Sequence, residues 1–129
     1  MSQEDVEVVQ AWLLAFEEDR DAFAALTHPA IEWMPFEDNH TPAHGVDGAL
    51  RIRDGWLDAW DEHNTEIEEI LDADGGVYLA ARLVGRGKGS GAMVEVRLYG
   101  HFKVLDGKVV YFYEHVNRED AREAVGLEE

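Results

Sequence analysis

The chain has 129 residues, no cysteine and a formal net charge of −17. This length predicts one domain over residues 1–129, and the lack of cysteine excludes disulfides and fits a reducing cytoplasm, where we expect the protein. Because the chain has neither a basic stripe nor an apolar run of roughly 18 residues, we expect neither nucleic acid nor a membrane as a partner.

The first half of the chain predicts three helices and one strand. Helical spacing of apolar residues predicts helices over 2–18, 20–26 and 46–63. A strand is expected over 31–36, and it should lie at a sheet edge or end there because Pro35 cannot donate to a ladder. The segment 37–45 is polar and contains proline and glycine, so it predicts a loop.

The second half of the chain predicts four antiparallel strands and a short helix. Turn signals separate strands over 65–72, 77–86, 93–105 and 108–117, and the helix follows over 118–125. Gly100 lies in the middle of the third strand and predicts a bend or bulge. Helices followed by a meander of strands predict an α+β fold, in which a curled sheet packs on the amphipathic helices around a cavity.

Glu114 is a carboxylate on an apolar strand face. Side chains alternate along a strand, so Glu114 shares its face with Phe112 and Val116. An unpaired carboxylate there would cost several kcal/mol, and Arg82 on a neighbouring strand offers a partner. We therefore predict an Arg82–Glu114 pair, which either fixes the sheet or serves as a polar anchor or acid–base group at a pocket floor.

The order of elements and several motifs resemble the SnoaL-like family, within the nuclear transport factor 2-like and ketosteroid isomerase-like superfamily. The motifs are DAFAAL (21–26), IEW (31–33), HGVDGAL (44–50), FKVLDGKVV (102–110) and YEHVNREDA (113–121). The resemblance implies a cone-shaped, curved antiparallel sheet packed on the N-terminal and central helices. It specifies the fold better than the reaction, because relatives on such a fold include enzymes of several kinds and non-enzymes.

The resemblance also places other residue types at the family's acid–base positions. Trp12 aligns with the oxyanion-binding tyrosine of ketosteroid isomerases, Met34 with their general base, and Gly100 with their second oxyanion acid. The limonene epoxide hydrolases are similar in pairing an arginine with a carboxylate on the last strand, which Arg82 and Glu114 match. The standard isomerase and cyclase mechanisms are therefore not expected, whereas a lone carboxylate could still activate water.

Large apolar side chains and one glycine are the predicted ligand contacts. They are Trp12, Phe16, Met34, Trp56, Trp60, Tyr78, Leu98, Gly100, Phe102 and Phe112. These residues fit either an ordinary core or a roomy pocket for a flat or long-chain ligand. In the loop, Asp38 and His40 are candidates for an acid or base at the pocket rim, which we favour over a metal site with His44. No metal or cofactor is expected.

Polar and aromatic side chains alternate onto the opposite face of the last two strands. This outer set comprises Arg97, Tyr99, His101, Tyr111, Tyr113 and His115. Such a mixture is typical of an interface, so we expect a homodimer through the outer sheet face; the alternative is a tyrosine-rich solvated surface.

Two functions from different classes remain open. The first is a SnoaL-like protein that takes a small polyketide-, steroid- or terpenoid-like ligand and acts as an isomerase, cyclase or hydrolase. That function requires acid–base chemistry from Glu114, Arg82 or the loop. The second is a non-catalytic ligand-binding or interaction module, which is favoured if the polar groups of the cavity only pair with one another.

Overall fold

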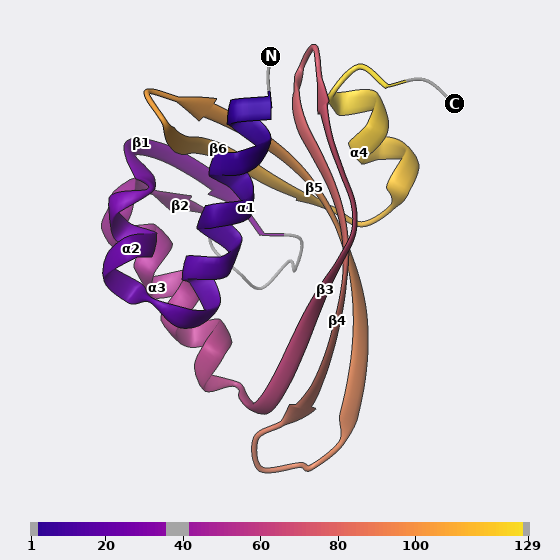
Figure 1. Cartoon of the computed structure of the whole chain (residues 1–129). Helices are drawn as coiled ribbons and strands as arrows, with labels where there is room; N and C mark the ends of the chain where they lie inside the picture. Colours follow the sequence, from indigo (N-terminus) through magenta and orange to yellow (C-terminus); the bar gives the residue numbers. More distant parts are fainter. Residues whose placement is uncertain (1–2, 36–41, 128–129) are drawn as a thin grey trace.

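The computed structural model describes residues 3–35 and 42–127 (Figure 1). Its helices are α1 (Gln3–Glu18), α2 (Arg20–Ala25), α3 (Gly45–Asp58) and α4 (Arg118–Ala124). Its strands are β1 (Thr27–Met34), β2 (Ala43–His44), β3 (Trp60–Ala73), β4 (Gly76–Gly87), β5 (Met93–Leu105) and β6 (Lys108–His115). Within the described residues, no helix is both long and apolar enough to cross a membrane.

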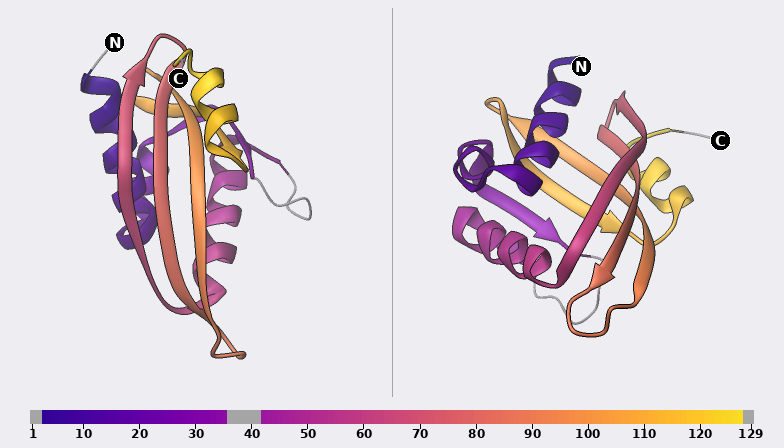
Figure 2. Two further views of the ribbon diagram at one scale, coloured as in Figure 1. Left: turned by 90° about the vertical axis from the view of Figure 1, so that its right-hand side faces the viewer. Right: turned by 60° about the horizontal axis from the view of Figure 1, so that its bottom comes forward.

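The strands form one mixed sheet in the order β2-β1-β6-β5-β4-β3. The meander from β3 to β6 is antiparallel, as the sequence predicts, whereas β1 runs parallel to β6 through pairs such as Trp33 with Phe112. In Figure 2, β1 and β6 run obliquely to β3 and β4, which shows that the sheet is strongly twisted. In Figure 1, α1, α2 and α3 lie to one side of the long strands and α4 to the other. The predicted α+β class is confirmed.

The third helix is shorter than predicted, and the strand after it is longer. α3 ends at Asp58 instead of residue 63, and β3 begins at Trp60, which pairs with Gly87. A Cβ at Gly85 would lie 2.6 Å from the Trp60 ring, so this glycine makes room for the indole. The partner strand thus gives residues 60–63 a ladder and a packing site, which outweigh their helical spacing.

Aromatic rings fill the core between α1 and the sheet. Trp12 is fully buried, and its Nε1 donates a 2.9 Å hydrogen bond to Oγ1 of Thr27. Phe102 and Phe112 stack with ring centroids 4.1 Å apart. A Cβ at Gly100 would lie 2.9 Å from the Phe112 ring, and the register runs through Gly100 without a shift. Gly100 therefore makes room for the stacked rings, and the bulge, one of the two alternatives predicted at this position, is wrong.

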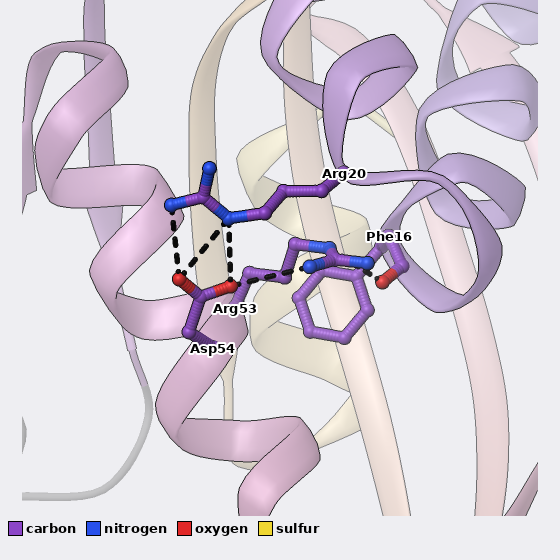
Figure 3. Close-up of polar contacts among 4 residues, drawn as sticks. All are labelled: Phe16, Arg20, Arg53 and Asp54. Atoms are coloured by element: carbon purple, nitrogen blue, oxygen red, sulfur yellow. Dashed lines mark hydrogen bonds and ion pairs between the residues drawn. The ribbon is translucent and has the colours of Figure 1, made fainter.

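A buried arginine joins α3 to the end of α1 (Figure 3). Arg53 is 8% exposed, and its Nε donates a 2.8 Å hydrogen bond to the carbonyl oxygen of Phe16. Arg53 also contacts Asp54 at 3.2 Å, and Asp54 in turn accepts hydrogen bonds from Arg20. The Arg20 hydrogen bond is the main reason that the pKa of Asp54 lies below its ordinary value. These contacts fix the end of α1 beside the cavity.

Candidate functional site

A cavity of about 360 Å³ lies between α1, α3 and the inner face of the sheet. Its most exposed lining residues are on α1 and β3, including Leu14 at 59% and Ile67 at 40% exposure. The described part of the cavity therefore opens to solvent between these two elements.

One face of each central strand makes the floor of this cavity. The strands contribute Leu79, Ala81, Leu83, Val96, Leu98 and Phe112, and the helices contribute Trp12, Leu13, Phe16, Ile52 and Trp56. Because paired residues on neighbouring strands share a face, the register of β4, β5 and β6 brings these side chains together. The deep part of the cavity is consequently apolar.

Glu114 lies on this inner face, as its alternation with Phe112 predicts. It pairs across the sheet with Gly100 and lines the cavity wall. Its Oε2 accepts a 2.5 Å hydrogen bond from Nε1 of Trp33 on the parallel strand β1. A hydrogen bond to the charged form lowers the cost of holding a carboxylate beside apolar groups. The cavity thus contains a fixed polar group in an apolar wall.

The predicted Arg82–Glu114 pair is wrong, because the two side chains leave opposite faces of the sheet. The register aligns Glu114 with Gly100 and then with Leu79, so the odd-numbered residues of this part of β4 face inward. Arg82 faces outward, where its guanidinium contacts Glu66 at 3.3 Å. An arginine–carboxylate arrangement similar to that of the limonene epoxide hydrolases is therefore not assembled from these two residues.

Only part of the predicted set of ligand contacts borders the cavity. Trp12, Phe16, Trp56, Leu98 and Phe112 line it. The other predicted contacts do not line it. Tyr78 packs against α4 on the outer face of the sheet, and Met34 points outward beside Tyr113. Trp60 packs against Gly85, and Gly100 lies against the stacked rings of Phe102 and Phe112. Asp38 and His40 lie outside the described residues. In the described part of the chain, no group of three or more His, Cys, Asp or Glu side chains could hold a metal ion.

A second polar group at the cavity was not predicted from the sequence. Glu17 lines the cavity, and its Oε2 accepts a 2.7 Å hydrogen bond from Oγ1 of Thr65. Its Oε1 lies 3.5 Å from Nδ1 of His63, at ion-pair distance. Glu17 is off the apolar stripe of α1, which made it look like a solvent-facing residue. Its partners lie on β3, with Thr65 lying 48 positions later in the chain, so no local pattern of the sequence could have found it.

The predicted outer set does share the face away from the cavity. Tyr99 pairs with His115, and His101 pairs with Tyr113. Burial is the main reason that the pKa of each of the two imidazoles lies below its ordinary value of 6.5. His101 donates a 2.8 Å hydrogen bond from Nε2 to the carbonyl oxygen of Gly75, which fixes the proton on Nε2 and partly offsets the effect of burial on its pKa.

The fold and the site together define an α+β protein whose curved sheet closes on helices around an apolar cavity. The sequence model of the SnoaL-like domain matches residues 9–112, and the chain belongs to this family. The comparison with curated proteins found no match.

Solved structures share the fold over most of the chain. An NTF2-like protein from Burkholderia thailandensis is 23% identical with a TM-score of 0.77, over 96% of this chain and 98% of that chain. TerC, co-crystallised with polyporic acid, is 14% identical with a TM-score of 0.75, over 95% and 98%. An LEH-like epoxide hydrolase from M. tuberculosis is 16% identical with a TM-score of 0.73, over 96% and 90%. At these identities the likeness concerns the fold.

Proposed function

We propose that this SnoaL-like protein binds a small hydrophobic ligand of polyketide-, steroid- or terpenoid-like character in its cavity. The observation that carries the proposal is the Glu114 carboxylate, hydrogen-bonded to Trp33 in an otherwise apolar wall. Pockets that orient small molecules combine an apolar lining with a few fixed polar groups in this way. Glu114 would hold a polar group of the ligand at the wall formed by β1 and β6.

Acid–base chemistry by Glu114 is the catalytic form of this proposal. A carboxylate beside a bound ligand can take a proton from a carbon acid or from water, which would serve an isomerase, a cyclase or a hydrolase. Arg82 faces away from the cavity, so we assign it no part in this chemistry. Non-catalytic binding in the same cavity is the alternative, and turnover separates the two.

The experiment begins with native mass spectrometry of the purified protein. An added mass that is released on unfolding and displaced by N-phenyl-1-naphthylamine supports ligand binding in the cavity. Turnover of an epoxide or a β,γ-unsaturated ketone that is lost in Glu114→Gln supports the catalytic form. Binding without turnover in such a panel supports the alternative, and the absence of both a copurified mass and binding of the naphthylamine contradicts the proposal.

We also propose that the protein forms a homodimer through the outer face of β5 and β6. Tyr113 is 40% exposed on this face, and the rings of Tyr113 and His115 lie 4.4 Å apart. Exposed aromatic groups among polar ones are typical of interfaces. Light scattering at micromolar concentration should give twice the chain mass, and Tyr113→Glu should give a monomer; a monomeric wild-type protein contradicts this proposal.

A further inference from the structure

Along the described lining of the cavity, acidic side chains are present and lysine and arginine are not. Among the described lining residues are three glutamates, Glu17, Glu18 and Glu114, and no lysine or arginine. Glu17 and Glu18 lie in the last turn of α1, which contains no basic residue. Carboxylates are unfavourable at a helix C-terminus, because the helix dipole is negative there. The stability of α1 therefore does not explain why these side chains are acidic.

Glu17 is oriented by residues of the neighbouring strand. Thr65 donates a 2.7 Å hydrogen bond to one carboxylate oxygen, and His63 lies 3.5 Å from the other. The side chain of Glu17 is 27% exposed, so it borders both solvent and the cavity. A carboxylate held in this way can accept hydrogen bonds from a hydroxyl or ammonium group at the mouth.

Glu17 and Glu114 lie at distant parts of the same cavity. Across the sheet, Glu114 on β6 is aligned with Ile70 on β3 through the paired residues of β5 and β4. The two residues are three strand spacings apart, or roughly 14 Å. Ile70 pairs with Leu79 and Thr65 pairs with Leu83, four residues further along β4, which corresponds to roughly 13 Å along the strand. The apolar side chains between the two carboxylates would contact an elongated ligand.

We infer that Glu17, oriented by Thr65 and His63, recognises the head group of the ligand at the cavity mouth. It selects an elongated apolar molecule with an ammonium or hydroxyl head group over the same molecule with a carboxylate. The reason is that an anionic head group would lie beside acidic side chains without a basic residue among the described lining residues. This inference rests on the proposed function, and it adds the chemical class of the ligand.

Three probes with one chain length test the selection: decylamine, decanol and decanoate, each displacing N-phenyl-1-naphthylamine at neutral pH below the micellar range. In the wild-type protein, decylamine and decanol should bind more tightly than decanoate. Glu17→Gln should reduce the ratio of the decanoate Kd to the decylamine Kd by about three- to tenfold, as expected for a partly exposed charged hydrogen bond. Glu7→Gln is the matched control, since it removes one charge from an exposed position of α1.

Thr65→Val is the second variant, because it keeps the charge of Glu17 and removes its hydrogen-bond donor. It should weaken decylamine binding while the protein melts as a folded domain. The inference is overturned if Glu17→Gln changes the ratio no more than Glu7→Gln does. It is also overturned if the ratio changes in Glu114→Gln instead. If the naphthylamine itself does not bind, the proposed function fails, and that result is distinct from the other two.

Discussion

Trp33 and Glu114, on the parallel strands β1 and β6, are joined by a hydrogen bond from the indole nitrogen to a carboxylate oxygen. Strand β1 therefore supplies the partner that the sequence led us to expect from β4. The bond closes the cavity wall next to the core aromatic groups, because the Trp33 ring also lies 5.3 Å from that of Phe112. The Trp33 side chain therefore both packs in the aromatic core and holds the Glu114 carboxylate in place.

A double-mutant cycle on this pair should show a coupling free energy of about 1.5–3 kcal/mol, the range for hydrogen bonds to charged groups. Trp33→Phe and Glu114→Met, neither of which can make this hydrogen bond, would be measured singly and together by urea unfolding. Each single variant loses the charged hydrogen bond, so the double variant should be more stable than the sum of the two losses predicts. Additive losses would show that the bond contributes no coupling.

Gly100→Ala should destabilise the protein by about 1–3 kcal/mol, because the added methyl group would overpack the core. Its Cβ would lie 2.9 Å from Phe112 and 3.0 Å from Phe102. Gly55→Ala is the control, since nothing lies within 4 Å of its added Cβ and it is in the helix α3. The control should gain up to about 1 kcal/mol. Equal melting temperatures for the two variants would be inconsistent with the packing described for Gly100.

Arg53→Met should lower the free energy of unfolding by about 2–3 kcal/mol, because it removes the donor to the Phe16 carbonyl oxygen. Arg51→Met on the same helix is the control, and a change within about 0.5 kcal/mol is expected at its exposed position. Chemical denaturation measures both. A loss of similar size in the two variants would mean that the Arg53 contacts in Figure 3 contribute little.

Acidification should reduce stability through His101. Burial keeps the folded-state pKa of His101 below 6.5, so below about pH 6.5 the unfolded chain takes up the proton first. The contribution of the neutral imidazole is complete above that pH and is lost as the pH falls through the lowered pKa. His101→Gln can keep a donor for Gly75 and does not titrate there. Urea unfolding from about pH 7.5 to 5 should therefore show a shallower decline in this variant than in the wild type, and identical slopes would count against the mechanism.

How much of the site could be predicted depends on what covers each strand. On β6, Val110 and Phe112 alternate with the more polar Tyr111 and Tyr113, so the inward direction of the Glu114 side chain followed from the period of two. On β4, Leu79 and Ala81 face the cavity while Tyr78 and Ala80 face α4, so both faces are buried. Because neither face of this part of β4 is polar, the alternation of side chains does not show which face points to the cavity. Arg82 was therefore assigned to the wrong face of the sheet.

Long-range partners explain the other differences from the prediction. The spacing of apolar residues predicted α1 and most of α3, because these helices bury one stripe each. The end of α3 was misplaced because Trp60 packs against Gly85, which lies 25 positions later in the chain. Glu17 was missed for a similar reason, since its partners His63 and Thr65 are on β3. A local pattern contains no information about such contacts.

The most direct test of the central claim is a titration of N-phenyl-1-naphthylamine into the wild-type protein and into Ala81→Leu. Ala81 is 3% exposed and lines the cavity, so a larger side chain there removes ligand volume. Ala11→Leu, at an exposed position of α1, is the matched control, and melting temperatures verify folding. If the cavity is the binding site, the probe Kd should rise at least about tenfold in folded Ala81→Leu, equivalent to roughly 1.4 kcal/mol, and stay unchanged in the control. Equal Kd values in all three folded proteins would contradict the claim.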